Sequence, residues 1–398
     1  MIDFSLTEEQ ALLQRTARDF AQNEIKPLAR EIEKLDYSTA RPWEMCKPVF
    51  DKAAELGFTL LLIPEKYGGL GRGCIDNVII QEEFAAADIG IASYLGSAKT
   101  YPRILLEGGN EEQRERWLGE IVASGGFLIA GAQSEPDVAG SEAFCPFPNP
   151  KLGIKTFARR EGDEYVINGS KSAFITNAGV ARYYLLYCRT DLSKPAYEST
   201  SAFYVPADTP GLTVGKRTEM LGMKAVQHAE VFLDNVRVHK RDMLGEEGEA
   251  TAIMMRVSPY MATGLGASYV GLARAAYEYA LDYARQRQSW GQPIIRHQAI
   301  GLMLAEMYVM VQSARMMVWD AAYAVDTGSP LAGPLKAPAA KTYAVEIAIK
   351  TAQNAVKILG GYGLTKEYQA EKFLRDAWMG YSCDFTGDML RLGMAHAL

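Results

Sequence analysis

The sequence predicts an α+β fold with three domains in the order helices, strands, helices. Apolar residues recur at helical spacing over roughly the first 120 residues, short β-rich runs between turn residues follow, and long amphipathic segments fill the remainder. We therefore expect an N-terminal α-helical domain over residues 1–124, a middle antiparallel β domain over 125–243 and a C-terminal four-helix bundle over 244–398.

The N-terminal domain opens with Thr7 and Gln10, a capping-box pair that predicts the start of a helix. Apolar residues then follow on one helical face: Leu13, Ala17 and Phe20. The glycine-rich stretch 64–71 is expected to interrupt the helices, which resume and continue over 111–121.

The middle domain is predicted from five β-rich runs: 127–130, 164–167, 183–188, 202–205 and 231–233. Turn-forming sequences such as Asn-Gly and Asp-Thr-Pro-Gly separate these runs, which is typical of an antiparallel sheet. The segment 145–152 contains several prolines, which cannot donate backbone hydrogen bonds, so we expect a surface loop there.

The C-terminal domain is predicted to contain helices over 264–287, 297–326, 341–359 and 367–379, with a last helix after Asp384. Glycines at 360 and 361 end the third of these helices, as glycine commonly does. Consecutive long amphipathic helices favour a bundle.

The composition excludes several classes of protein. Hydrophobic residues make up 48% and charged residues 23%, which is typical of a folded globular chain. The net charge of −6 and the lack of a basic cluster argue against nucleic-acid binding, and the lack of a long uncharged apolar run argues against membrane insertion. The five cysteines are scattered, which predicts no disulfide framework, and the four histidines are not clustered, which predicts no metal site. The start of the chain does not resemble a signal sequence, so we expect a cytoplasmic location.

Four stretches of the chain carry a pattern that points to a function. They are S-E-P-D-V-A-G-S at 134–141, N-G-S-K-S-A-F-I-T-N at 168–177, Y-A-R-Q-R-Q-S-W-G-Q-P-I at 283–294 with H-Q at 297–298, and G-G-Y-G at 360–363 with R-D-A at 375–377 and D-F-T at 384–386. In this order, and together with weaker matches at 64–69, 111–114 and 221–224, they span essentially the whole chain and resemble the acyl-CoA dehydrogenase family. A Rossmann glycine motif, a P-loop and a nucleophile elbow are absent from the sequence.

The resemblance implies FAD as cofactor, bound at a dimer interface within a homotetramer that is a dimer of dimers. The residues it assigns to the cofactor are Ser134, Phe174, Thr176, Arg287, Trp290, Gln298, Lys357, Gly360, Gly361, Thr386 and Asp388. By resemblance, Arg287 reaches the FAD of a neighbouring subunit, and its guanidinium suits a pyrophosphate. Each of these residues also has a purely structural alternative. Arg287 and Lys357 could be solvent-exposed residues of a helix, Trp290 could fill the core, and the two glycines could only cap a helix.

The resemblance also assigns the catalytic base to Asp384, where the family has the glutamate of a Tyr-Glu-Gly-Thr motif. Aspartate is one methylene shorter than glutamate, and Phe385 in place of glycine adds bulk next to it, while Cys383 in place of tyrosine removes bulk. These two residues and Ser141, near the position of the CoA pantetheine, are assigned to the substrate. The competing role for Asp384 is to cap the last helix, and Asp388 and Asp88 are rival bases.

The predicted function is FAD-dependent α,β-dehydrogenation of an acyl-CoA thioester, with electrons passed to an electron-transfer flavoprotein. Aspartate bases occur in relatives that act on cyclohexane-type carboxyl-CoA esters, so we expect a short, branched or cyclic acyl group such as cyclohexane-1-carbonyl-CoA. The family's CoA-directed arginine falls on Ala262, with Arg256 nearby. This keeps open a nitroalkane-oxidase-like enzyme of the same fold, beside an acyl-CoA oxidase, a DNA-associated relative and a non-catalytic scaffold.

Overall fold

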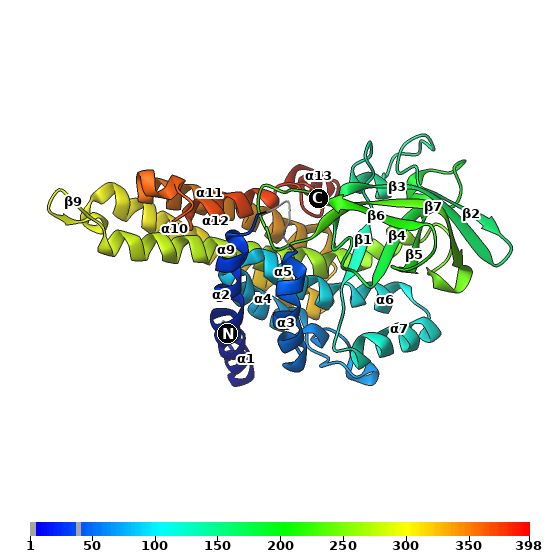
Figure 1. Cartoon of the computed structure of the whole chain (residues 1–398), viewed down its shortest axis with the longest axis horizontal. Coiled ribbons are helices and arrows are strands. Elements are labelled where there is room, and N and C mark those ends of the chain that lie inside the picture. The colour runs from blue at the N-terminus through cyan, green and yellow to red at the C-terminus, as the bar shows by residue number, and fades with distance from the viewer. Residues whose placement is uncertain (1–4, 37–40) are drawn as a thin grey trace.

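The computed structural model describes residues 5–36 and 41–398. N-terminal helices, a β domain and a helical bundle follow one another in an elongated molecule, with the β domain at one end and the bundle reaching to the other (Figure 1). The predicted order of the three parts is confirmed. The first four residues, which enter the expectation about a signal sequence, lie outside the described residues.

The N-terminal part consists of helices: α1 Glu8–Phe20, α2 Lys26–Glu33, α3 Pro42–Glu55, α4 Cys74–Ala87, α5 Ile89–Thr100, α6 Pro102–Gly108 and α7 Glu111–Ala123. The first five pack into an apolar core that they share with the C-terminal helices, whereas α6 and α7 pack into a separate core next to the β domain. The capping box is confirmed: Gln10 N donates to Thr7 Oγ1 at 3.1 Å and Thr7 N donates to Gln10 Oε1 at 3.2 Å. The stretch 64–71 interrupts the helices as predicted, with Gly68 and Gly71 at φ values of +90° and +61°.

The middle part is one eight-stranded sheet with the path β6-β7-β3-β2-β4-β5-β8, and β1 pairs with β4. Its strands are β1 Ile129–Ala132, β2 Phe157–Glu161, β3 Glu164–Thr176, β4 Tyr183–Arg189, β5 Thr200–Pro206, β6 Leu212–Arg217, β7 His228–His239 and β8 Met243–Leu244, with the short helix α8 Ala196–Ser199 before β5. Most neighbours are antiparallel as predicted, while β1 and β2 pair with β4 in parallel.

Strand β4 lies inside the sheet and is buried along its whole length. Successive side chains of a strand point to opposite faces. Tyr183, Leu185 and Tyr187 accordingly pack into a core shared with α6, α7 and the start of the bundle, whereas Tyr184, Leu186 and Cys188 pack into a second core on the other face. One face of the sheet is thereby joined to the helices.

The C-terminal part contains α9 Ala250–Gln286, α10 Gln298–Asp326, α11 Ala337–Leu359, α12 Ala370–Met379 and α13 Gly387–Ala397, with the small hairpin β9 Gln288–Ser289 and β10 Gln292–Pro293 between α9 and α10. Helix α9 begins well before the predicted residue 264, because it continues through Pro259, a residue that usually interrupts a helix. Gly271 lets α4 approach closely, since a Cβ there would lie 2.4 Å from the Glu82 carbonyl oxygen.

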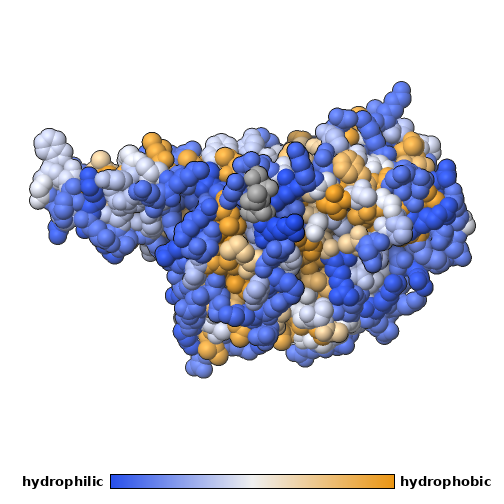
Figure 2. Space-filling view, in the orientation of Figure 1, coloured by the Kyte–Doolittle hydropathy of each residue, from blue (hydrophilic) through white to orange (hydrophobic). Residues whose placement is uncertain are grey.

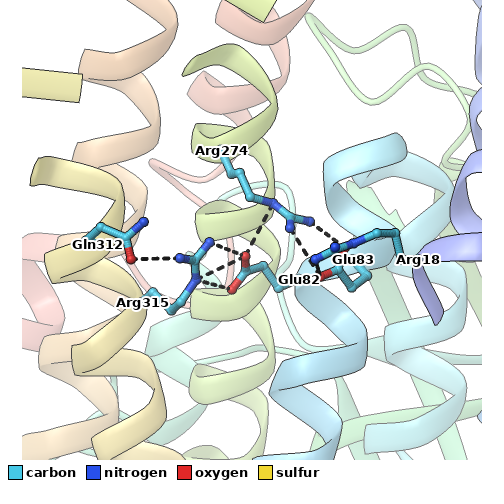
Figure 3. A network of polar contacts seen from close by, with 6 residues as sticks. All are labelled: Arg18, Glu82, Glu83, Arg274, Gln312 and Arg315. Carbon is cyan, nitrogen blue, oxygen red and sulfur yellow. Dashed lines mark hydrogen bonds and ion pairs between the residues drawn. The ribbon is translucent and has the colours of Figure 1, made fainter. Parts of the chain in front are cut away.

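An ion-pair network joins α1 and α4 to α9 and α10 (Figure 3). Glu83 binds Arg18 Nη2 at 2.9 Å and Arg274 Nη2 at 2.7 Å, and Glu82 binds Arg315 Nη2 at 2.7 Å. The glutamates are almost fully buried, so their charges depend on these partners. The network fixes the N-terminal helices against the bundle.

The surface differs between the ends and the middle of the molecule. On the face that Figure 2 shows, hydrophobic side chains gather near the middle, where the helices meet the β domain, and the two ends are mostly hydrophilic. Across residues 5–36 and 41–398, no helix combines the length and the apolar character that a membrane span requires.

Candidate active site

The predicted base lies in a strained turn between α12 and α13. Asp384 and Phe385 have φ values of +42° and +71°, in the left-handed region that favours glycine. Aspartate tolerates this region better than most residues, but phenylalanine does so poorly. Such strain persists only where surrounding contacts hold the backbone in place.

The Asp384 side chain is exposed in the single chain, and its charge interacts with one nearby cation. Its side chain is accessible to water, yet burial among the surrounding atoms raises its pKa, and the charge of Lys341 acts in the opposite direction. Over the residues that the structure describes, no hydrogen bond or ion pair occupies this carboxylate. It is therefore available to a ligand.

The rival roles for acids near this turn are resolved in part. The N-cap of α13 is Thr386, whose Oγ1 accepts from Met389 N at 3.3 Å, so the alternative that Asp384 caps this helix is wrong. Asp88 is occupied, because it caps α5 through Ile91 N and pairs with Lys372 Nζ at 2.8 Å.

The third acid, Asp388, lies outside the turn on the first turn of α13. It is mostly exposed and lies 3.8 Å from Arg391. Together with Arg391 it lines a cleft between α11, α12 and α13.

Aromatic side chains stand next to the turn that carries Asp384. The Phe385 ring lies 6.3 Å from Phe144, which packs edge-on against Tyr187 at 5.5 Å. Burial, together with the charge of Asp384, raises the pKa of Tyr101, Tyr187 and Tyr269, so these phenols stay neutral. The carboxylate thus has uncharged aromatic side chains among its neighbours. Sequence reasoning missed Phe144 and the three tyrosines, because they come from elements distant in the chain.

Two of the predicted cofactor residues meet at a bulge in β3. The register between β3 and β7 shifts between Lys171 and Ile175, which displaces the intervening residues from the ladder. Ser172 Oγ lies 2.6 Å from Ser134 Oγ and 3.4 Å from Phe174 N. Phe174 leaves 62% of its surface exposed, although it is a large apolar residue. A bulge is how a strand accommodates an additional residue. The stretch N-G-S-K-S-A-F-I-T-N at 168–177 carries one residue more than the N-G-x-K-x-W-I-T-N pattern of the family that it resembles.

Buried polar contacts fix the loop that carries Ser134. Glu135 accepts from Thr156 N at 2.9 Å and from Lys171 Nζ at 2.9 Å, and both side chains are almost fully buried. Sequence reasoning missed Glu135, Lys171 and Ser172 as positioning residues. All three lie inside the quoted stretches 134–141 and 168–177, which was the available signal.

A second group of predicted cofactor residues lies at the far tip of the bundle. Arg287 ends α9 and its guanidinium stands 5.5 Å from the Tyr362 ring, next to Gly360 and Gly361. A Cβ added at either glycine would meet nothing within 4 Å, so open space adjoins this backbone. Gly360 also caps α11 at φ +59°, so the helix-cap role holds as well.

The remaining residues at this end are open to solvent. Trp290 is 93% exposed, so the alternative that it fills the core is wrong. Gln298 starts α10, and Lys357 lies near the end of α11, both exposed.

The two groups are not brought together within one chain. Figure 1 shows the hairpin that carries Trp290 at the end of the bundle opposite to the β domain. The residues present nevertheless fit a flavin in two parts. The β domain offers the exposed Phe174 ring and the Ser134 hydroxyl, and the bundle tip offers the Arg287 guanidinium beside open glycine backbone. Thr176 stands at the end of β3 and belongs with the first part.

The predicted substrate residues take different positions. Cys383 and Phe385 flank Asp384, and Ser141 lies in a short helical turn, residues Gly140–Phe144. Ala262 lies on α9, where a CoA-directed arginine was expected, and Arg256 donates instead to the Glu107 carbonyl at 2.9 Å.

Comparisons with known proteins cover nearly the whole chain. Family models for the acyl-CoA dehydrogenase N-terminal, middle and C-terminal domains match residues 7–125, 132–236 and 251–397. The chain is 36% identical to an acyl-CoA dehydrogenase of Bacillus subtilis (strain 168), over 97% of each chain, and 35% identical to the 3-(aryl)acrylate reductase of Clostridium sporogenes (strain ATCC 15579), over 93% of each.

A solved structure gives the same result at the level of the fold. Butyryl-CoA dehydrogenase from Megasphaera elsdenii superposes with a TM-score of 0.89 at 30% identity, covering 100% of this chain and 99% of that one. The chain therefore belongs to the acyl-CoA dehydrogenase family and is an FAD-dependent oxidoreductase that acts on acyl-CoA.

Proposed function

We propose that this enzyme dehydrogenates a short, branched or cyclic acyl-CoA thioester, with an ester of the cyclohexane-1-carbonyl-CoA type as the favoured substrate. The observation that carries the proposal is the Asp384 carboxylate, whose neighbour Phe385 places a ring 6.3 Å from Phe144. We further propose that the electrons pass to an electron-transfer flavoprotein, the acceptor that the family resemblance implies.

Asp384 is the group with the properties of a general base. Removal of the α proton next to a thioester needs an ionised carboxylate within hydrogen-bond reach of Cα. Because burial raises the pKa of Asp384, its carboxylate is a stronger base than an ordinary aspartate once it ionises. Bound FAD supplies the acceptor for the hydride that leaves Cβ. The shorter aspartate requires the substrate to lie closer to the backbone of this turn than it would with glutamate.

The side chains next to the proposed base support a compact acyl group. Phe385 stands directly next to the base and packs towards Phe144, so a bulky ring occupies space where glycine would leave room. A flat or ring-shaped acyl group can stack against such aromatic side chains, whereas a long flexible chain needs a continuous apolar channel. The relative named 3-(aryl)acrylate reductase makes aryl-substituted esters a second class to examine.

A neighbouring subunit completes the cofactor site in this proposal. Ser134 follows β1 in the β domain, whereas Arg287 directly precedes the hairpin at the far end of the bundle, so we expect both to contact one FAD only if the bundle tip comes from another chain. Large apolar side chains that are more than half exposed on α10 support such an association: Leu302, Val309 and Tyr323. We propose a homotetramer built as a dimer of dimers.

A substrate screen tests the proposal. Purified enzyme with FAD is mixed anaerobically with cyclic, short branched, 3-arylpropionyl, C12 and C16 acyl-CoA esters, and loss of flavin absorbance is followed. The proposal expects fastest reduction by cyclic or short branched esters. Equal or faster reduction by C12 or C16 esters contradicts it, and reduction by nitroalkanes alone would favour the nitroalkane-oxidase-like alternative.

A further inference from the structure

A buried lysine lies beneath the turn that carries Asp384. Lys341, near the start of α11, is 1% exposed. Its Nζ donates to the carbonyl oxygens of Cys383 and Phe385, each at 2.7 Å. The two acceptors belong to the residues immediately before and after Asp384, so one ammonium group holds the backbone on both sides of the proposed base.

These bonds act on a backbone that needs to be held. Asp384 and Phe385 are consecutive non-glycine residues at positive φ, and such a backbone is unfavourable unless surrounding contacts compensate. The direction in which the Asp384 carboxylate points depends on these same φ values. Loss of the Lys341 bonds would let the turn relax and move the carboxylate.

Lys341 is also the cation whose charge acts on Asp384. The other titratable groups that the Asp384 charge reaches in the described structure are Tyr101, Tyr187 and Tyr269, from separate elements, and the adjacent Cys383. Burial raises the pKa of all four, which leaves them neutral. Burial lowers the pKa of Lys341, and the Asp384 charge opposes this effect.

We propose that Lys341 is a positioning residue for the dehydrogenation, because it fixes the turn that aims the Asp384 carboxylate at the substrate. This inference rests on the proposed role of Asp384 as the base. Lys341 does not touch the reacting atoms itself; it acts through the carbonyls of Cys383 and Phe385.

The test compares Lys341→Met, Lys341→Gln and the control Lys336→Met, a half-exposed lysine that pairs with Asp320 just before α11. Anaerobic flavin reduction is measured against pH at saturating substrate, and amide hydrogen exchange is measured in the peptide that spans residues 380–388. Lys341→Met should reduce flavin at least ~10-fold more slowly, the scale of a misplaced catalytic group. Its rate profile should move to higher pH, because the cation that favours ionised Asp384 is gone.

Lys341→Gln separates the two effects, since its amide is a neutral and shorter donor. It should show the same shift to higher pH with a smaller loss of rate than Lys341→Met. Exchange in the 380–388 peptide should be faster in both Lys341 variants and unchanged in Lys336→Met.

Rates, pH profiles and exchange that match the wild type in both Lys341 variants would overturn the proposal. If none of the acyl-CoA esters reduces the flavin of the wild-type enzyme, the proposed function fails instead. The exchange measurement still decides whether Lys341 holds the turn.

Discussion

Phe385 shows how a single residue shapes both the backbone and the pocket. The sequence indicated added bulk next to the base, and the structure adds that this bulk sits at φ +71° and packs towards Phe144. The strain was not predictable, because a positive φ at phenylalanine contradicts its own preference and is imposed by contacts from elsewhere. Lys341 could not be predicted either, since the contact joins residues 42 positions apart.

Phe385→Gly should broaden substrate use. Glycine suits the left-handed backbone and removes the ring beside Asp384, so the ratio of kcat/KM for a C12 ester to that for a cyclic ester should rise at least ~10-fold. Steady-state assays with a dye acceptor measure this ratio. Phe147→Gly, in the exposed loop at 145–152, is the control and should leave it unchanged. An unaltered ratio in Phe385→Gly would show that the ring does not limit the acyl group.

At the scale of elements, periodicity located most helices, while their limits depended on tertiary contacts. The helix over 341–359 was predicted nearly in full, and α11 ends at Leu359 as expected. The beginning of α9 was missed because Pro259 opposes helix locally, whereas Ile253 and Val257 of this segment pack into the core shared with α6 and α7. The bulge in β3 was signalled only by one residue of additional spacing.

The ion-pair network in Figure 3 joins α4 to α9, so we expect it to contribute to the stability of the fold. Glu83→Gln would leave Arg274 in a buried site with only part of its negative partner charge, and should lower the free energy of unfolding by roughly 3 kcal/mol. Chemical denaturation at pH 7 measures this. Glu31→Gln removes an exposed pair with Lys34 and should cost less than ~1 kcal/mol.

The same pair of variants gives a pH dependence. Burial acts to raise the pKa of Glu83, but the hydrogen bonds and charges of Arg18 and Arg274 outweigh it, so the pKa lies below its ordinary value. A lowered carboxyl pKa stabilises the fold above the pKa of the unfolded state, about 4.3, and this contribution is lost as pH falls through the lower folded value. The difference between wild type and Glu83→Gln should therefore be full at pH 7 and shrink below about pH 4. A difference that grows with acid would contradict this account.

At the scale of the whole molecule, the residues that we propose for the cofactor lie in two separate parts of one chain. The sequence predicted the residues of both parts by resemblance, and the structure shows that the bundle separates them. Neither composition nor periodicity could have given this separation, because it follows from the length and direction of α9 and α10.

Arg287→Ala should therefore weaken FAD retention in the assembled protein. The change removes a guanidinium that can form charge-assisted bonds to the pyrophosphate, so the ratio of FAD to protein after gel filtration should fall well below that of the wild type. Arg285→Ala, an exposed arginine in the last turn of the same helix, is the control and should retain FAD. Full retention in Arg287→Ala would remove the bundle tip from the proposed site.

The central claim is that Asp384 removes the α proton, and anaerobic stopped-flow reduction of the enzyme-bound flavin by a cyclic acyl-CoA tests it most directly. Asp384→Asn keeps nearly the same volume, so FAD binding should survive while flavin reduction slows at least ~100-fold, the scale of general-base removal. In the wild type the rate should rise with pH as Asp384, whose pKa is raised by burial, becomes ionised. An Asp384→Asn enzyme that reduces its flavin at the wild-type rate would contradict the account and make Asp388 the next base to examine.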